Sequence, residues 1–324
     1  METEVTTSQD MNAPVTERYS HKVLFDRKEL SKRQLQDQIF AIISLLALAF
    51  GLTTLLMLII DLGTTGLGRI DMDFLSNFPS RVPSRAGILS AWVGSLCVMI
   101  TTAMAAIPVG IAAGVYLEEY APKNWMTALI ELNIVNLAGI PSITFGLMAL
   151  GMFVYKFGFG QSILTAGLTL GLLVLPIIIV TTRESLRTIP STIREAAFAM
   201  GASRWQVIQH HLLPYSTGGI LTGVIISLSR AIGETAPLIT IGALTFIAFL
   251  PTSPFTDQVP FISFQWLKDP FTVLPIQMFN WVSRPQEEFH VNAAAAGLIL
   301  LTLTLLLNGV AIYIRASFRR KIKW

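Results

Sequence analysis

Two charged residues, four positions apart, interrupt a stretch of the chain that is otherwise free of charge. Arg230 and Glu234 lie within residues 215–250, where no other Asp, Glu, Lys or Arg occurs. If a membrane helix begins at Tyr215, Arg230 lies about 22 Å along it, inside the hydrocarbon. An arginine at the centre of a membrane costs about 2.5 to 3.5 kcal/mol, so such residues usually face a protein or water-filled interior and mark a pathway. Glu234 comes one helical turn later, where it can pair with Arg230 and keep the empty site neutral. The alternative is that the pair only satisfies itself and locks two helices together.

A second group of residues lies in the charged segment 183–214. It contains, in order, Glu195, Ala196, Ala197, Gly201, Leu213 and Pro214. Local rules predict a helix that is opened by a capping box of Thr192 with Glu195 and ended by Gly201 in a left-handed conformation. Ser203 with Gln206 predicts a second helix that ends before Pro214. On these rules alone, the segment is a plain helix-turn-helix loop.

The elements that must position these residues are membrane spans. A bilayer core about 30 Å thick requires about 20 apolar helical residues. Six stretches meet this requirement, namely residues 38–60, 86–117, 132–155, 157–182, 215–250 and 291–314. Lys156, with glycines at 158 and 160, predicts a tight hairpin between the third and the fourth stretch. The predicted fold class is therefore all-α, a polytopic bundle of transmembrane helices.

The distribution of basic residues predicts the sides of the membrane. The stretch 215–250 could hold one span with a partly re-entrant segment, or two short spans. With six spans, one side of the membrane carries 16 Lys and Arg residues and the other side carries 6. Because basic residues concentrate in cytoplasmic loops, we expect six spans with both termini in the cytoplasm. A seventh span would place one of the two basic ends of the chain outside.

This topology divides the chain into predicted regions. They are a cytoplasmic tail over 1–37, a first transmembrane helix over 38–60, a transport domain over 86–315 and a basic cytoplasmic tail over 316–324. The tail 1–37 is expected to be disordered, leading to a short amphipathic segment near residues 23–35. The external loop 251–290 has six prolines and eight aromatic residues, so it is expected to fold onto the membrane surface or onto the helix ends, with Trp266 and Trp281 at interfacial depth.

Composition excludes several classes of protein. The chain is 52% hydrophobic and only 13% charged, with a mean hydropathy of +0.61, which excludes an ordinary soluble domain or a disordered chain. The net charge of +3 gives no indication of nucleic-acid binding. Cys97 stands alone, and His210 with His211 has no further ligand nearby, so neither a disulfide nor a metal site is expected. The sequence contains no Gly-Lys dipeptide, so a phosphate-binding loop for ATP is absent as well.

The segment 183–214 resembles the EAA loop of ABC importer permeases. That loop reads Glu-Ala-Ala, three residues, Gly, nine residues, an aliphatic residue, any residue, Leu and Pro. The chain matches it except at His211, which replaces the aliphatic residue. The resemblance implies a type I importer permease fold of the MetI-like kind. It also implies that a short helix with Glu195, Ala197 and Gly201 docks into a groove of an ATPase subunit and transmits its closure to the membrane helices.

Residues 230–238 resemble one group within these permeases. Their sequence Arg-Ala-Ile-Gly-Glu-Thr-Ala-Pro-Leu is similar to the signature segment of phosphate-specific transport permeases. The ending from Thr235 to Leu238 looks like the PstA family rather than the partner PstC family. From their charges, Arg230 is expected to attract the anion and Glu234 to balance it when the path is empty. From their positions, Thr235 and Thr240 are expected to supply hydrogen-bond donors.

The resemblance also implies an assembly. The chain is expected to be a conduit and not an enzyme, to bind no cofactor itself, and to pair with a homologous second permease. Two ATPase subunits that use ATP and magnesium, and an external phosphate-binding protein, complete the expected complex in the cytoplasmic membrane. Each negative charge that enters against 100 mV costs about 2.3 kcal/mol, so inward phosphate transport needs such a power source.

Three alternatives stay open. The first is an importer permease for another oxyanion, such as sulfate or molybdate. The second is a secondary transporter or anion channel that needs no ATPase, which gives no reason for the loop at 183–214. The third is a structural membrane scaffold, which leaves Arg230 unexplained.

Overall fold

The computed structural model describes residues 15–255, 261 and 263–321, and every regular element among them is a helix. Two compact units are distinguished, Met1–Asp61 and Leu62–Trp324. The first holds most of α1 (Val15–Gly66), a helix of 52 residues. The expected disordered tail is therefore helical from Val15 onward, because no glycine or proline occurs between residues 15 and 50 to end a helix. Residues 1–14 lie outside the described residues.

The number of spans agrees with the sequence. Five helices in the described part of the chain are long and apolar enough to cross a membrane, and a bent pair makes a sixth. The five are Lys32–Arg69, Leu89–Tyr120, Ile163–Arg187, Arg204–Ile232 and Glu287–Ser317. The fold class predicted from the sequence is thus confirmed.

The third span differs from the expected single helix. It consists of α4 (Trp125–Leu137) and α5 (Ser142–Ala149), the latter continued by a π-helical turn to Lys156, with a bend of 105° between them. Pro141 lies at the break, where it lacks an N–H and disfavours helical backbone at Ile140. The hairpin that follows is as predicted, since Gly158 and Gly160 both have φ of +69°.

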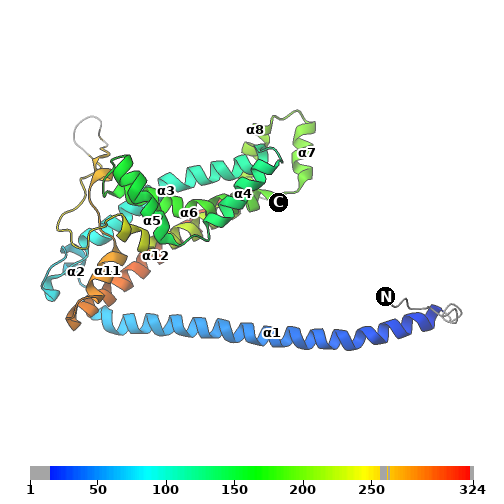
Figure 1. Cartoon of the computed structure of the whole chain (residues 1–324), viewed down its shortest axis with the longest axis horizontal. Helices are drawn as coiled ribbons and strands as arrows, with labels where there is room; N and C mark the ends of the chain where they lie inside the picture. Colours follow the sequence, from blue (N-terminus) through cyan, green and yellow to red (C-terminus); the bar gives the residue numbers. More distant parts are fainter. Residues whose placement is uncertain (1–14, 256–260, 262, 322–324) are drawn as a thin grey trace, which may run out of the picture. The chain divides into compact units, whose positions relative to one another are not determined.

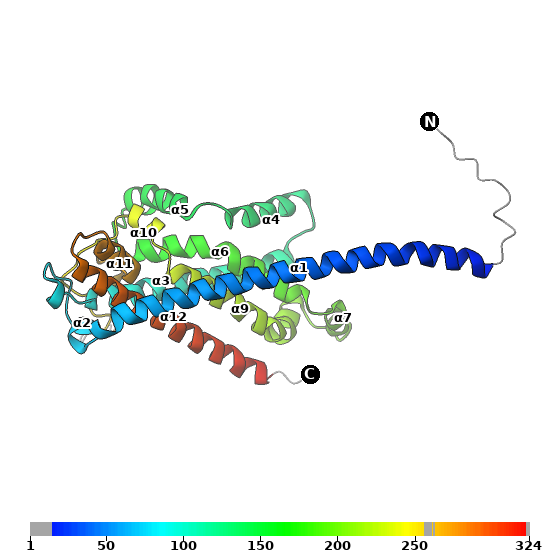
Figure 2. The same ribbon diagram turned by 90° about the horizontal axis from the view of Figure 1, so that it is seen from below.

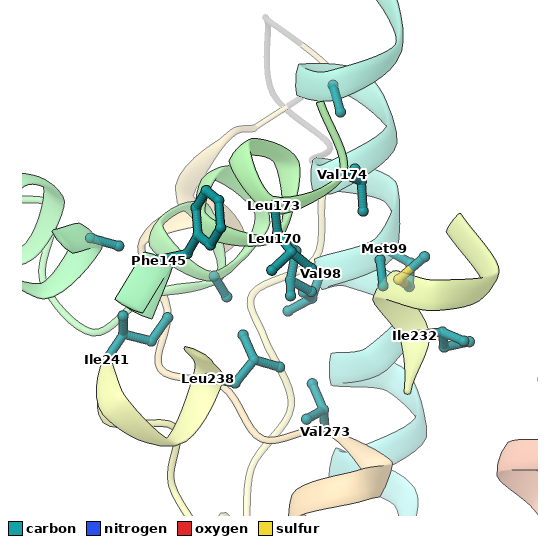
Figure 3. Packing of buried hydrophobic residues seen from close by; sticks show 14 of the residues in the cluster. Val98, Met99, Phe145, Leu170, Leu173, Val174, Ile232, Leu238, Ile241 and Val273 are labelled. Atoms are coloured by element: carbon teal, nitrogen blue, oxygen red, sulfur yellow. The ribbon is translucent and has the colours of Figure 1, made fainter. Parts of the chain in front are cut away.

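Three helices form the centre of the second unit, namely α3 (Leu89–Val115), α6 (Ile163–Arg187) and α9 (Leu213–Ile232). A Cβ at Gly110 would lie 2.7 Å from Ile178 Cγ2, and one at Gly167 would lie 2.4 Å from Thr101 Cγ2. The missing side chains therefore allow α3 and α6 to pack closely (Figures 1 and 2). A buried apolar core joins this pair to α5 and to the segment after α9, as Figure 3 shows for Leu170, Phe145 and Leu238.

The two ends of the bundle carry different elements (Figure 1). The short helices α7 (Ser191–Ala199) and α8 (Arg204–Val207) lie at one end, together with the C-terminal part of α12 (Glu287–Lys321). The helices α2 (Met72–Ser76) and α11 (Leu274–Val282) lie at the other end.

The described part of the loop 251–290 packs on the helix ends, which is one of the two positions predicted for it. The side chain of Trp281 in this loop is fully buried, and the centroid of its ring lies 5.9 Å from that of Phe74 and 6.5 Å from that of Phe289. The loop thus contributes a helix, α11, to a second apolar core between α2 and α12. Trp266 is half-buried against the main core.

Candidate functional site

The first part of the candidate site is the end of α9, which carries Arg230. The helix ends at Ile232, and Gly233 forms its C-cap. Glu234 lies in the following turn, where its backbone N–H donates to the carbonyl of Ala231 at 3.2 Å. The side chain of Arg230 is exposed and that of Glu234 is half-buried, and the structure records no ion pair between these two described residues. The predicted helical pairing is therefore wrong, because the helix stops before it reaches Glu234.

The turn leads into α10 (Ala236–Thr240), which packs against α5. Gly146 of α5 permits this contact, since a Cβ there would clash with Thr240 Oγ1 and lie 2.7 Å from Pro237 Cα. Leu238 is buried in the main core, which also contains Phe145 (Figure 3). Thr235 is half-buried and precedes α10 without a side-chain cap bond. The signature segment is thus held in place by the broken third span.

A cavity of about 160 Å³ lies on another face of α9, between α3 and α12. Its lining is almost wholly apolar, including Met99, Ile225 and Leu307. Three polar residues line it as well. Ser229 donates to Asn308 Oδ1 and so ties α9 to α12, and the Thr304 hydroxyl donates to the carbonyl of Leu300. No charged residue lines this cavity.

The second part of the candidate site is the loop between α6 and α9. Gly201 ends α7 with φ of +85°, as predicted, and Ser203 with Gln206 forms the predicted capping box of α8. The predicted capping box of Thr192 is wrong, because Pro190 is the N-cap and makes no side-chain bond.

The second helix of the loop does not end before Pro214. A π-helical turn, Ile208–Leu212, joins α8 directly to α9, and Pro214 lies in the first turn of α9. The second arm of the loop and the fifth span thus form one continuous helical element, and Pro214 lies where its hydrogen bonding changes from π-helical to α-helical. Leu213 is half-buried and Pro214 is exposed.

The surface of this loop combines small and large apolar groups. Glu195 and Ala196 are exposed, whereas Ala197 faces inward and is 3% exposed, packed in a third apolar core with Leu186 and Ile208. Large apolar side chains around the turn are exposed, namely Phe198, Met200 and Trp205. Such a patch at a charged end of the molecule is typical of a protein interaction surface.

Sequence reasoning missed the ion pairs that hold this loop. Glu119, in the π-helical turn Tyr116–Tyr120 that continues α3, accepts from Arg194 of α7 at 2.8 Å. Glu118 accepts from Arg187 at 3.0 Å and from Arg183 at 3.4 Å. The only signal in the sequence is the pair of adjacent glutamates at the end of an apolar run, which does not identify their partners.

The chain is similar to known transport proteins over most of its length. Residues 106–323 match the family model described as "Binding-protein-dependent transport system inner membrane component". The phosphate transport system permease protein PstA of Yersinia pestis is 32% identical over 298 residues, which cover 91% of this chain and 94% of that protein. The probable ABC transporter permease protein YqgI of Bacillus subtilis (strain 168) is 30% identical over 243 residues, 74% of this chain and 81% of that protein.

Two solved transporters share the fold. A bacterial alginate ABC transporter, solved with an alginate-bound periplasmic protein, matches with a TM-score of 0.59 at 15% identity, covering 85% of this chain and 93% of its own. The MetNI methionine ABC transporter matches with a TM-score of 0.53 at 18% identity, covering 69% and 93%. At this identity the likeness establishes the fold alone, which is the MetI-like fold of type I importers. With the family match over two thirds of its residues, the chain belongs to the inner membrane components of binding-protein-dependent transport systems.

Proposed function

We propose that the chain is the membrane permease subunit of an ATP-driven ABC importer that carries inorganic phosphate across the cytoplasmic membrane. The observation that carries this proposal is the likeness to the PstA protein of Yersinia pestis over 91% of the chain, which includes the segment from Arg230 to Leu238. Family membership supports the architecture, and the phosphate-specific segment supports the substrate.

Arg230 is the residue we assign to attraction of the anion. Its guanidinium is exposed at the end of α9 and forms no ion pair with a carboxylate among the described residues, so its charge is available to a ligand. A planar guanidinium matches the geometry of phosphate oxygens. Glu234 lies beyond the end of α9 and is not assigned to pairing with Arg230, while the Thr235 hydroxyl offers a neutral donor.

The loop of α7 and α8 is the surface we assign to the ATPase. Glu195, Ala196 and the turn at Gly201 are exposed, and Ala197 supports them from below. Leu213 and Pro214 begin α9, and Arg230 lies in its last turn, so a movement of the loop reaches the anion site along α9.

The complex requires further subunits. In this proposal the transport domain, residues 86–315, pairs with a second, PstC-like permease. ATP and magnesium are used by two PstB-like ATPase subunits on the cytoplasmic side, and a PstS-like protein delivers phosphate from outside. The permease itself performs no catalysis and holds no cofactor, and both of its termini lie in the cytoplasm.

The test is uptake of radiolabelled phosphate and sulfate by cells that lack their own high-affinity phosphate system. This chain is restored together with its partner subunits, with or without an active ATPase. Phosphate uptake that depends on both supports the proposal. ATP-dependent uptake of sulfate alone would discard the substrate, and uptake without the ATPase would discard the architecture.

The role of Arg230 is tested in the same cells. Arg230→Ala, expressed at the parent level, is expected to abolish uptake, and Arg230→Lys to retain part of it because the charge remains. Lys156→Ala is the matched control, since Lys156 is also an exposed basic residue but lies in the hairpin before α6. If Arg230→Ala took up phosphate at the parent rate, Arg230 would not be part of the transport pathway.

A further inference from the structure

The end of α3 holds the α7–α8 loop through one residue, Glu119. On one side of the Gly201 turn, Arg194 of α7 donates to Glu119 Oε1 from Nη2 at 2.8 Å and from Nε at 3.2 Å. On the other side, Arg204 of α8 donates from Nη1 to the backbone carbonyl of Glu119 at 3.2 Å. The guanidinium of Arg204 also lies over the ring of Tyr120, 5.6 Å from its centroid. Both arms of the loop are therefore fastened to the same point.

Arg194 joins three elements. Besides Glu119, it donates to the carbonyls of Ile189 at 2.9 Å and Leu186 at 3.0 Å, at the end of α6. Arg194 and Glu119 are only 21% and 12% exposed, so their contact is shielded from water. A charge-assisted hydrogen bond in such surroundings is stronger and more directional than one in water.

The neighbouring Glu118 extends the connection into the membrane helices. It accepts from Arg183 and Arg187 of α6, and Arg183 also contacts Glu131 of α4 at 2.6 Å. The ends of α3, α4 and α6 are thus joined to one another at the level where Glu119 holds the loop. Beneath the charges, Val115, Ala197 and Ile208 pack in one apolar core.

We propose that Glu119 is a positioning residue for transport, which transmits movement of the ATPase-docking loop to α3. The inference rests on the proposed function, because it needs an ATPase that moves the loop. A tilt of α7 acts on Arg194, and the two-point hold of Arg194 and Arg204 prevents the loop from turning independently of α3. Without the negative charge of Glu119, the hydrogen bonds from Arg194 lose their charged acceptor and hold α7 to α3 only weakly, while α8 keeps its bond to the Glu119 carbonyl. ATP hydrolysis then continues but no longer responds to substrate.

The experiment uses the complete complex in liposomes and measures ATPase activity with and without the phosphate-loaded binding protein. Glu119→Gln and Arg194→Gln are each expected to lower the ratio of stimulated to basal activity by about tenfold, within the usual range of coupling between sites. Because both substitutions remove the charge attraction of the same pair, Glu119→Gln in the Arg194→Gln background should change the ratio by less than about twofold. Co-purification of the ATPase with each variant is expected to match the parent.

The matched control is Glu184→Gln. Glu184 also pairs with an arginine, Arg187 at 3.2 Å, but both residues lie on α6 and the carboxylate is 63% exposed, so the pair connects no elements. If Glu119→Gln had the same ratio of stimulated to basal activity as the parent, the proposal would be overturned. It would also be overturned if the fold-loss in the double variant equalled the product of the two single losses. Loss of ATPase co-purification in Glu119→Gln would overturn it in favour of a purely structural role. If the parent complex itself shows no stimulation by phosphate, the proposed substrate has failed instead.

Discussion

Gly201 ends α7 in a backbone conformation that residues with a side chain rarely adopt. Gly201→Ala is expected to destabilise the turn by about 1 to 2 kcal/mol, the cost of a left-handed conformation for an L-residue. A Cβ at this position meets nothing within 4 Å in the chain itself, so the effect arises from the backbone and not from a clash. The effect of Gly201→Ala is measured by phosphate uptake and by co-purification of the ATPase, and both should fall.

Gly201→Asn separates conformation from contact. Asparagine adopts the left-handed conformation more readily than alanine but has a larger side chain. If the turn lies against the ATPase, the asparagine variant should also lose co-purification, whereas a turn that is only conformationally constrained should tolerate it. Parent behaviour of both variants would show that Gly201 is not part of the docking surface.

The buried arginine of α6 yields a prediction about stability. Arg183 is 8% exposed and contacts Glu131 at 2.6 Å, so Glu131→Ala leaves a buried charge with one partner fewer. Removing one member of a fully buried pair destabilises by roughly 3 to 5 kcal/mol, and the loss here should be smaller, because Glu131 is 33% exposed and Arg183 keeps Glu118 as a partner. The thermal unfolding midpoint of the purified chain should fall markedly, whereas Glu184→Ala, at an exposed pair, should leave it near the parent. Equal midpoints would show that Arg183 does not need Glu131.

The importance of a residue could be predicted where its type conflicts with the residues around it. Arg230 is conspicuous because a charge is rare inside an apolar stretch, and Gly201 because it follows a helical pattern. The ion pairs of Glu118 and Glu119 could not be predicted, since their partners lie 65 and 75 residues away in the chain. The pairing of Glu234 with Arg230 was wrong because spacing alone does not reveal that Gly233 ends the helix.

At the scale of elements, the broken third span shows what hydropathy cannot detect. Residues 132–155 read as one apolar stretch, yet the chain bends by 105° between α4 and α5. Composition reports that a segment is apolar, whereas the bend follows from Pro141 and from the docking of α10 on α5. Likewise, Trp281 has the amphipathic side chain of an interfacial residue, but Phe74 and Phe289 bury it.

The contact between α5 and α10 can be tested at Gly146. Gly146→Ala should displace the signature segment, because the added Cβ would meet Thr240 and, at 2.7 Å, the backbone of Pro237. The backbone of Pro237 cannot yield as a flexible side chain would. We therefore expect most phosphate uptake to be lost while the chain is still inserted in the membrane. Uptake assays and the expression level in membranes measure the two effects.

Gly151→Ala is the matched control for that substitution. Gly151 also lies in the second half of the third span, but a Cβ there meets nothing within 4 Å. It should transport phosphate at the parent rate. If Gly146→Ala does so too, the position of α10 does not determine transport.

At the scale of the whole molecule, the count of basic residues predicted which segments share a side. In the second unit, α7, α8 and the C-terminal part of α12 do lie at one end of the bundle, and α2 and α11 at the other (Figure 1). Alternation of spans requires this arrangement, because each crossing reverses the direction of the chain. Which end faces the cytoplasm depends on the excess of Lys and Arg, whose effect acts during membrane insertion.

Orientation is therefore tested by labelling from one side. In a Cys97→Ser background, Glu195→Cys in α7 and Gln286→Cys before α12 each place one thiol at an exposed position at opposite ends of the bundle. A membrane-impermeant thiol reagent added to intact cells should label position 286 and leave position 195 unlabelled until the cells are permeabilised. Because the positions lie at opposite ends, labelling of 195 in intact cells with protection of 286 would place the α7–α8 loop outside. An ATPase in the cytoplasm could not then reach Glu195, and both the docking surface and the transmission through Glu119 would have to be abandoned together.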